Sequence, residues 1–170
     1  MKYLLIAMGT LFALLLLVVV IGVLLPKTHS ASRSAVFKTT PEQLFALIDG
    51  PQTWRSNVKK YEPVGFPDGR RQWRETDDHG KIITYEAVER HPPTLLKTRI
   101  VTGNLPYSGT WTLNLEPGDG LTVLRITEHG DVYNPVFRFV SRFLIGHTRT
   151  IDNYIRDLEV ATGQKAEMRD

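Results

Sequence analysis

A histidine and a tyrosine interrupt an apolar stripe near the C-terminal end of the chain. Seven residues there repeat at alternating spacings of three and four, which places them on one face of a helix: Phe137, Val140, Leu144, His147, Ile151, Tyr154 and Leu158. An imidazole exchanges protons near neutral pH. If His147 lies on the wall of a cavity, it can act as a hydrogen-bonding or acid–base group for a ligand. In a packed core, it is a histidine satisfied by a strand carboxylate or by the backbone.

Carboxylates in three strand-like runs are the complementary groups. Glu75 and Glu128 share the parity of neighbouring apolar strand residues, whereas Glu86 lies in a third run. An inward-facing carboxylate that meets Arg99 or His147 would form a buried pair with a shifted pKa. His147, Glu128 and Glu75 are therefore the candidate catalytic residues. The alternative is that each carboxylate faces solvent or the rim of the sheet.

Large side chains on the same runs are candidates for the wall of an apolar site. Apolar-ligand sites commonly combine aromatic walls with a few polar groups. Plain core packing of a curved sheet is the alternative for each residue. The candidate ligand-binding residues, from strands and helix together, are Trp73, Tyr85, Arg99, Trp111, Leu113, Val140, Leu144, His147, Ile151 and Tyr154.

A second apolar stripe, formed by Val136, Phe139 and Phe143, lies partly off the first face of the same helix. It can pack on a loop, line a pocket entrance or touch lipid. Arg138 and Arg142 are four residues apart, and their long side chains can reach from an apolar surface to water. We therefore expect a helix face with packing partners, and not a second membrane span, because the two arginines interrupt an apolar run that is too short to cross.

Several function classes lack their motifs. The chain has no cysteine, and no HExxH, P-loop, GxGxxG or GxSxG pattern occurs. The acidic TDDHG run at residues 76–80 fits a glycine-ended turn, so we expect no metal site and no cofactor. Without Lys2 and Lys27, the 21 Lys and Arg residues become 19 against 18 Asp and Glu, which is no signal for nucleic-acid binding.

The N-terminal segment predicts a membrane anchor. Residues 3–25 carry no charge, and these 23 residues exceed the roughly 20 needed to cross a bilayer. The apolar core of a cleaved signal peptide is shorter, about 7–15 residues, although the SAS run at residues 30–32 resembles a cleavage site. We expect a single-pass protein, of a bacterial inner membrane, that meets the bilayer through residues 3–25. Lysine and arginine are too evenly distributed around the span to orient it, and the oligomeric state is left open.

The remaining elements follow from turn and capping signals. We expect an anchor over residues 1–27, a polar tether over 28–34, a folded domain over 35–162 and a tail over 163–170. Within the domain, the patterns predict a strand at 35–39, a helix at 41–49, a short helix at 51–58, six strand runs from 60 to 130, and one helix of about 28 residues from Asn134-Pro135 to Gly163. Short turns between the runs favour an antiparallel meander, and hence an α+β fold of about six to seven strands wrapped around the long helix.

This element order resembles the START/polyketide-cyclase (SRPBCC) superfamily, including its membrane-anchored bacterial members. The similarity is carried by SRSAVFKTTPEQLFALIDGPQTWRSNV, ERHPPTLLKTRIV, SGTWTLNLEPGDGLTVLRITEHGDV and NPVFRFVSRFLIGHTRTIDNYIRDL. The resemblance implies a helix-grip fold with a cavity between sheet and C-terminal helix that holds apolar ligands such as lipids. It implies no single reaction, because relatives include cyclases, hydrolase-like enzymes, lipid carriers and ligand sensors.

Three functions are therefore open. The first is a non-catalytic, membrane-anchored domain that binds a lipid or another hydrophobic small molecule. The second is a cyclase, dehydratase or hydrolase that uses His147 and a strand carboxylate on a hydrophobic substrate. The third is a membrane-associated assembly or stress factor, for which we expect an exposed apolar patch around residues 139–143.

Overall fold

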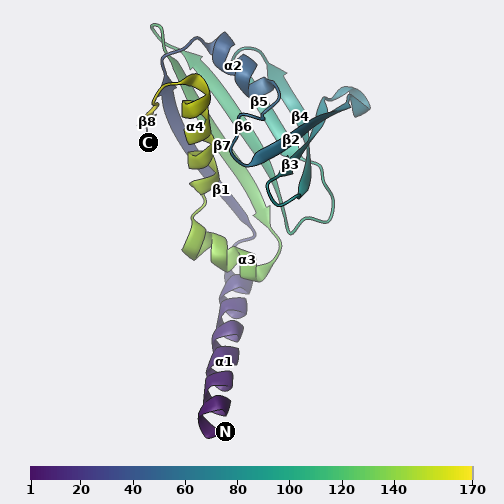
Figure 1. The fold of residues 1–170 in the computed structure, drawn as a ribbon, viewed down its shortest axis with the longest axis vertical. Coiled ribbons are helices and arrows are strands. Elements are labelled where there is room, and N and C mark those ends of the chain that lie inside the picture. The colour runs from purple at the N-terminus through teal and green to yellow at the C-terminus, as the bar shows by residue number, and fades with distance from the viewer. Residues whose placement is uncertain (170) are drawn as a thin grey trace.

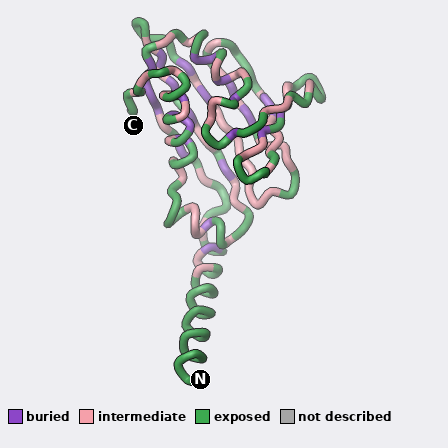
Figure 2. The backbone as a smooth tube through the Cα atoms, in the orientation of Figure 1, coloured by how far each residue is buried: buried purple, intermediate pink, exposed green. Residues whose placement is uncertain are grey.

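A long N-terminal helix projects from one end of an α+β domain (Figure 1). The structure, a computed structural model, describes residues 1–169, so Asp170 of the expected tail lies outside the described residues. Helix α1 (Lys2–Leu24) is long and apolar enough to cross a membrane by length and composition, features that a signal sequence also has. Its residues are exposed along almost its whole length (Figure 2).

An antiparallel sheet of eight strands, in the order β2-β3-β4-β5-β6-β7-β1-β8, forms the body of the domain. Its strands are β1 (Thr28–Phe37), β2 (Val58–Gly65), β3 (Gln72–Asp77), β4 (Ile82–His91), β5 (Leu95–Ile100), β6 (Tyr107–Pro117), β7 (Thr122–Val132) and β8 (Glu167–Arg169). Strands β2 to β7 are consecutive neighbours, as the short turns between them require. The α+β helix-grip fold and the meander are confirmed.

The first strand begins earlier than the sequence indicated. Residues 28–34, expected to be a tether, form most of β1 and pair with β7 from Thr28↔Asp131 onward. Pairing with β7 provides hydrogen-bond partners for the backbone N–H and C=O groups of residues 28–34. The polar side chains of this segment gave no sign of that pairing. As a result, three residues separate α1 from the sheet, and residues 167–169 of the expected tail add β8 to the far side of β1.

Of the two helices predicted after the first strand, the one at residues 41–49 forms with the predicted bounds and the second does not form. Helix α2 (Pro41–Asp49) has Thr40 as its N-cap, and the Thr40 side chain accepts from the Gln43 backbone N–H in a capping box. Residues 51–57, expected to be helical, form turns instead. A short 3₁₀ segment, η1 (Pro67–Gly69), lies between β2 and β3.

The expected C-terminal helix of about 28 residues is divided into three parts. These are α3 (Pro135–Val140), a π-helical turn η2 (Ser141–Ile145) and α4 (Arg149–Thr162). Gly146 separates η2 from α4 with φ 81°, a left-handed value that glycine adopts without a steric penalty. Helix α4 ends at Gly163, as expected.

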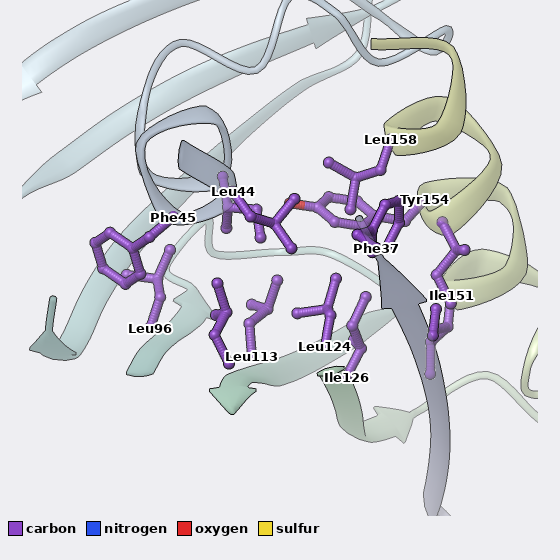
Figure 3. Close-up of a cluster of buried hydrophobic side chains, with 14 of the residues drawn as sticks. Phe37, Leu44, Phe45, Leu96, Leu113, Leu124, Ile126, Ile151, Tyr154 and Leu158 are labelled. Carbon is purple, nitrogen blue, oxygen red and sulfur yellow. The ribbon is translucent and has the colours of Figure 1, made fainter. Parts of the chain in front are cut away.

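The hydrophobic core fills the space between the sheet and the helices α2 and α4. Leu44 of α2 and Leu158 of α4 point toward side chains from the strands, among them Leu113 and Leu124 (Figure 3). Leu124 and Leu158 are fully buried. This packing holds α4 across one part of the sheet and leaves the part next to α3 and η2 for a cavity.

Candidate ligand-binding cavity

A cavity of about 460 Å³ lies between the sheet, the start of α4 and the η2 segment. Seven of the ten residues expected at a binding site line it: Trp73, Tyr85, Arg99, Trp111, Leu113, His147 and Tyr154. The candidate acids Glu75 and Glu128 line it too. The strands therefore bring together most of the expected side chains.

The other three expected residues lie elsewhere. Ile151 is fully buried in the core, Leu144 is 70% exposed and Val140 is half-buried outside the lining. The prediction assumed one straight α-helix, in which all members of the stripe share a face. The π turn and Gly146 change the helical phase between Val140 and α4, so the stripe does not continue across the break.

Aromatic rings form much of the cavity wall. Trp73 and Tyr85 are directly opposite each other on β3 and β4, and their rings stack with centroids 5.8 Å apart. The ring of Tyr154 from α4 makes edge contacts with Trp111 of β6 at 5.4 Å and with Trp54 at 5.2 Å. Such a wall offers large, flat apolar surfaces to a ligand.

A buried ion pair lies within this wall. The Arg55 guanidinium donates to a carboxylate oxygen of Glu75 at 2.9 Å, and the Trp73 indole N–H donates to the other oxygen at 2.9 Å. The Arg55 and Glu75 side chains are 14% and 6% exposed. Glu75 thus faces inward, but its partner is Arg55, and not Arg99 or His147 as expected.

The hydroxyl of Tyr154 is the unsatisfied polar group next to this pair. The residue is 4% exposed, its ring lies under the Arg55 guanidinium at 5.3 Å, and its hydroxyl has no hydrogen-bond partner among residues 1–169. Burial raises the pKa of Tyr154, with Arg55 acting in the opposite direction. The phenol therefore stays protonated, and its hydroxyl is a buried donor without a partner in the described part of the chain.

A second cluster of polar side chains, formed by His29, His147 and Glu128, connects β1 with the segment after η2. The rings of His29 and His147 stack with centroids 4.3 Å apart, and His29 Nε2 lies 3.8 Å from a Glu128 oxygen, beyond hydrogen-bond length. Gly130, opposite His29 on β7, makes room for this arrangement, because a Cβ there would lie 2.8 Å from His29 Nε2.

Burial is the main cause of the pKa shifts in this second cluster. It lowers the pKa of His29, with the nearby His147 adding to the shift and Asp131 opposing it. It also lowers the pKa of His147, with Arg142 adding to the shift. Both imidazoles are therefore neutral at pH 7. Burial raises the pKa of Glu128, and a hydrogen bond from the Trp111 side chain acts in the opposite direction.

The expected acid–base pair on His147 is not formed. Within residues 1–169, His147 makes no hydrogen bond or ion pair with a carboxylate or a tyrosine, and its close neighbour is the ring of His29. A general acid–base pair requires hydrogen-bond reach between its members or to a substrate. After the break at Gly146, His147 stacks on His29 of β1 and makes no direct contact with the strand carboxylates that it was expected to meet.

A family model described as "Polyketide cyclase / dehydrase and lipid transport" matches residues 28–159. The chain belongs to this family. The SRPBCC resemblance read from the sequence is thereby confirmed. No curated protein matches the chain.

Solved structures with similar folds include other members of this architecture. Norcoclaurine synthase from Thalictrum flavum is 12% identical, with 81% of this chain and 88% of that chain covered and a TM-score of 0.59. TTHA0849 from Thermus thermophilus is 17% identical over 81% and 100% of the two chains, with a TM-score of 0.62. MLL2253 from Mesorhizobium loti is 16% identical over 79% and 97%, with a TM-score of 0.60. At these identities the likeness concerns the fold.

In this polyketide cyclase-like domain, the remaining predicted residue, Arg99, lies at the edge of the cavity. Its guanidinium pairs with Glu86 at 2.8 Å, and Gln72 donates to the other Glu86 oxygen at 2.8 Å. Glu86 follows the inward-facing Tyr85, so this cluster is on the outer face of the sheet. The hydrogen bond from Gln72 lowers the pKa of Glu86, and Arg99 and Arg70 add to the effect against burial.

Sequence reasoning missed Arg55 and His29. Arg55 lies in the turns of residues 51–57, which were expected to be helical, and His29 lies in the segment that was expected to be a tether. For His29, a usable signal was the length of β7: an eleven-residue strand needs a partner longer than residues 35–39. No group of three or more His, Cys, Asp or Glu residues that fits a metal ion occurs in the described part of the chain.

Proposed function

We propose that this protein is a membrane-anchored domain that binds an uncharged lipid or another hydrophobic small molecule in its cavity. The cavity itself carries the proposal. Its volume of about 460 Å³ lies in the range of roughly 300–1,000 Å³ that is typical of small-molecule sites. Its walls combine stacked aromatic rings with a few polar groups, which is the usual composition of such sites.

The electrostatics of the wall favour a ligand without a net charge. Arg55 and Glu75 neutralise each other, and His29 and His147 are neutral at pH 7. An anionic ligand would need a cation to offset its desolvation, and two of the three Lys and Arg residues in the lining are already engaged, Arg55 by Glu75 and Arg99 by Glu86. The third, Lys81, contacts the hydroxyl of Tyr107. The free hydroxyl of Tyr154 instead suits one hydroxyl or carbonyl oxygen on an otherwise apolar molecule.

Helix α1 supports the location of this activity. We infer that it spans a bilayer, where poorly soluble ligands are concentrated, and that it keeps the domain at the membrane surface. Because β1 begins at Thr28, the connection is short and the domain remains next to the membrane. The family description includes lipid transport, which agrees with such a location.

Mass spectrometry of the bound molecule tests this function. The full chain is extracted in a mild detergent, and the masses of co-purifying small molecules are compared with those from a variant whose cavity is filled. Thr98→Phe introduces a ring into the cavity, whereas Thr112→Phe places the same ring on the outer face of β6, because Thr112 lies between the inward-facing Trp111 and Leu113.

The expected result is one class of uncharged apolar molecule with the wild type and with Thr112→Phe, and its loss with Thr98→Phe. Thermal unfolding of both variants shows whether the fold is kept. Retention of the same molecule by a folded Thr98→Phe variant, or no bound molecule in the wild type, would refute the proposal.

A further inference from the structure

An apolar surface remains uncovered on α3 and η2. Five of its large side chains are exposed by 40% or more, and we call them the interfacial patch: Val136 (43%), Phe137 (51%), Phe143 (58%), Leu144 (70%) and Ile145 (47%). Exposed apolar residues occur singly on most soluble domains, whereas five within ten residues indicate a surface that has a partner.

The patch is held rigidly at the end of α1. Helix α3 lies across that end (Figure 1), and Gly22, the buried residue of α1, contacts the backbone of Pro135. A Cβ at Gly22 would lie 2.6 Å from the Pro135 carbonyl carbon, so glycine is needed for this close approach.

A buried arginine strengthens the same joint. Arg138 is 8% exposed, and it donates to the carbonyl oxygens of Leu25 at 3.0 Å and Val23 at 3.4 Å, and to that of Tyr133 at 3.2 Å. The carbonyls at the C-terminal end of a helix lack partners within the helix and carry partial negative charge. Arg138 therefore satisfies the end of α1 with a side chain of α3 and fixes the angle between the two helices.

This joint determines the height of the patch relative to a bilayer. Twenty-three helical residues extend about 35 Å, close to the thickness of about 30 Å of the hydrocarbon core. When α1 spans the bilayer, its C-terminal end lies at the membrane–water interface, and α3 and η2 lie there too. The exposed cations Lys27 and Arg142 flank this level, where lysine and arginine side chains reach the lipid headgroups.

The patch also shares residues with the lining of the cavity. Phe137 and Ile145 belong to the patch and to the cavity lining, and Gly146 and His147 continue that lining. The patch and one part of the cavity wall are therefore formed by the same segment of the chain.

We propose that the interfacial patch is a bilayer-docking surface, seated in the interface beside α1, so that the cavity opens toward lipid and its ligand enters from the membrane. The inference rests on the proposed membrane anchor. A bilayer is the occupant that fits, because the patch continues from the end of a membrane-length apolar helix and is fixed to it by Gly22 and Arg138. A docking protein is the competing occupant.

Site-specific fluorescence quenching tests this surface. The chain has no cysteine, so one introduced cysteine carries the only label, an environment-sensitive NBD group. The labelled full chain is placed in nanodiscs of phosphatidylcholine, with or without bromine atoms near the carbonyl end of the acyl chain. Leu144→Cys reports on the patch, Leu24→Cys on the end of α1, and Val160→Cys, 77% exposed on α4, on the part of the domain remote from the patch.

The proposal predicts that brominated lipid removes at least about half of the fluorescence at Leu144→Cys and at Leu24→Cys, and little at Val160→Cys, since interfacial helices insert their apolar face only about 5–10 Å. Quenching at Leu24→Cys without quenching at Leu144→Cys would overturn the docking surface and leave the anchor intact. That outcome would favour a protein partner for the patch. No quenching at either position would overturn both the anchor and the docking surface, and equal quenching at all three would overturn the proposed geometry.

A variant pair tests the joint. Gly22→Ala adds a Cβ that overlaps the Pro135 carbonyl, whereas Gly9→Ala adds one where nothing lies within 4 Å. On the Leu144→Cys background, Gly22→Ala is expected to lower the quenched fraction by about half, and Gly9→Ala to leave it unchanged, since only the first separates the patch from the membrane end of α1. Equal quenching in both variants would contradict the role assigned to the joint.

Discussion

Replacing Arg55 by methionine removes the cation that faces Glu75 inside the cavity wall. Methionine keeps most of the length and apolar surface of the arginine side chain, and it lacks the guanidinium. After the substitution, Glu75 retains one hydrogen bond, from the Trp73 indole N–H at 2.9 Å, and loses the one from Arg55. The carboxylate is then buried without a charge partner.

The expected loss of stability follows from the burial of the pair. The side chains are 14% and 6% exposed, so the pair is not a surface salt bridge, for which a contribution of about 0–1 kcal/mol is typical. Removing one partner of a buried pair costs about 3–5 kcal/mol, because an uncompensated charge remains. We expect a loss of about 3 kcal/mol, at the lower end of this range, because Trp73 still donates to Glu75. That is a large share of the ~5–15 kcal/mol by which a domain is stable.

Urea unfolding of the full chain in mild detergent at pH 7, followed by tryptophan fluorescence, measures this loss. The double variant Arg55→Met/Glu75→Gln removes both charges and keeps an acceptor for Trp73, so it should recover most of the stability. Arg156→Met is a matched control on the exposed side of α4 and should change the free energy of unfolding by less than about 0.5 kcal/mol. A loss below about 1 kcal/mol for Arg55→Met, or no recovery in the double variant, would refute this reasoning.

Three further predictions concern the polar groups of the cavity. The pKa values of His29 and His147 are lowered from 6.5, so the unfolded chain binds more protons than the folded protein below that pH. The contribution of the two neutral histidines to the free energy of unfolding should therefore be fully present above pH 6.5, and it should decrease as the pH falls below 6.5 and through the lowered pKa values. A denaturation series in which the His29→Phe/His147→Phe variant keeps the wild-type slope below pH 6.5 would contradict this. Tyr154→Phe removes a buried, unpaired hydroxyl, so it should leave the melting temperature of the ligand-free protein unchanged or higher and reduce the amount of co-purified ligand; undiminished ligand would exclude a hydrogen bond from Tyr154. Gly130→Ala should displace the His29 ring and cost about 1–3 kcal/mol, visible as shifted imidazole signals by NMR, whereas Gly109→Ala, whose Cβ approaches a backbone oxygen at 3.4 Å, should leave these signals in place.

The sequence was sufficient for strands β2 to β7 because each of their signals is local. Alternating apolar residues and glycine- or proline-containing turns define β2 to β7, and Thr40-Pro41 defines the start of α2. With the sheet in place, Trp73, Tyr85, Trp111 and Leu113 had to share one face, since side chains alternate along a strand. This is why most of the cavity wall was predictable.

The missed features depend on contacts between distant segments. The seven-residue apolar stripe has helical spacing on both sides of Gly146, and only packing against β1 and α1 selects the break there. Arg55 is a charged residue in a turn, and no local pattern identifies its partner until β3 brings Glu75 to it. The joint between Gly22 and Pro135 links residues 113 positions apart, and no local pattern encodes it.

The central claim is that an uncharged apolar molecule occupies the cavity, and heavy-atom quenching of the cavity tryptophans tests it most directly. Trp73 and Trp111 line the cavity. The full chain in nanodiscs is titrated with the methyl ester of a dibrominated fatty acid, and its fluorescence is compared with that of Thr98→Phe and Thr112→Phe. We expect saturable quenching of the wild type and of Thr112→Phe, and strongly reduced quenching of a folded Thr98→Phe. Equal quenching of all three proteins, or none in the wild type, would contradict it.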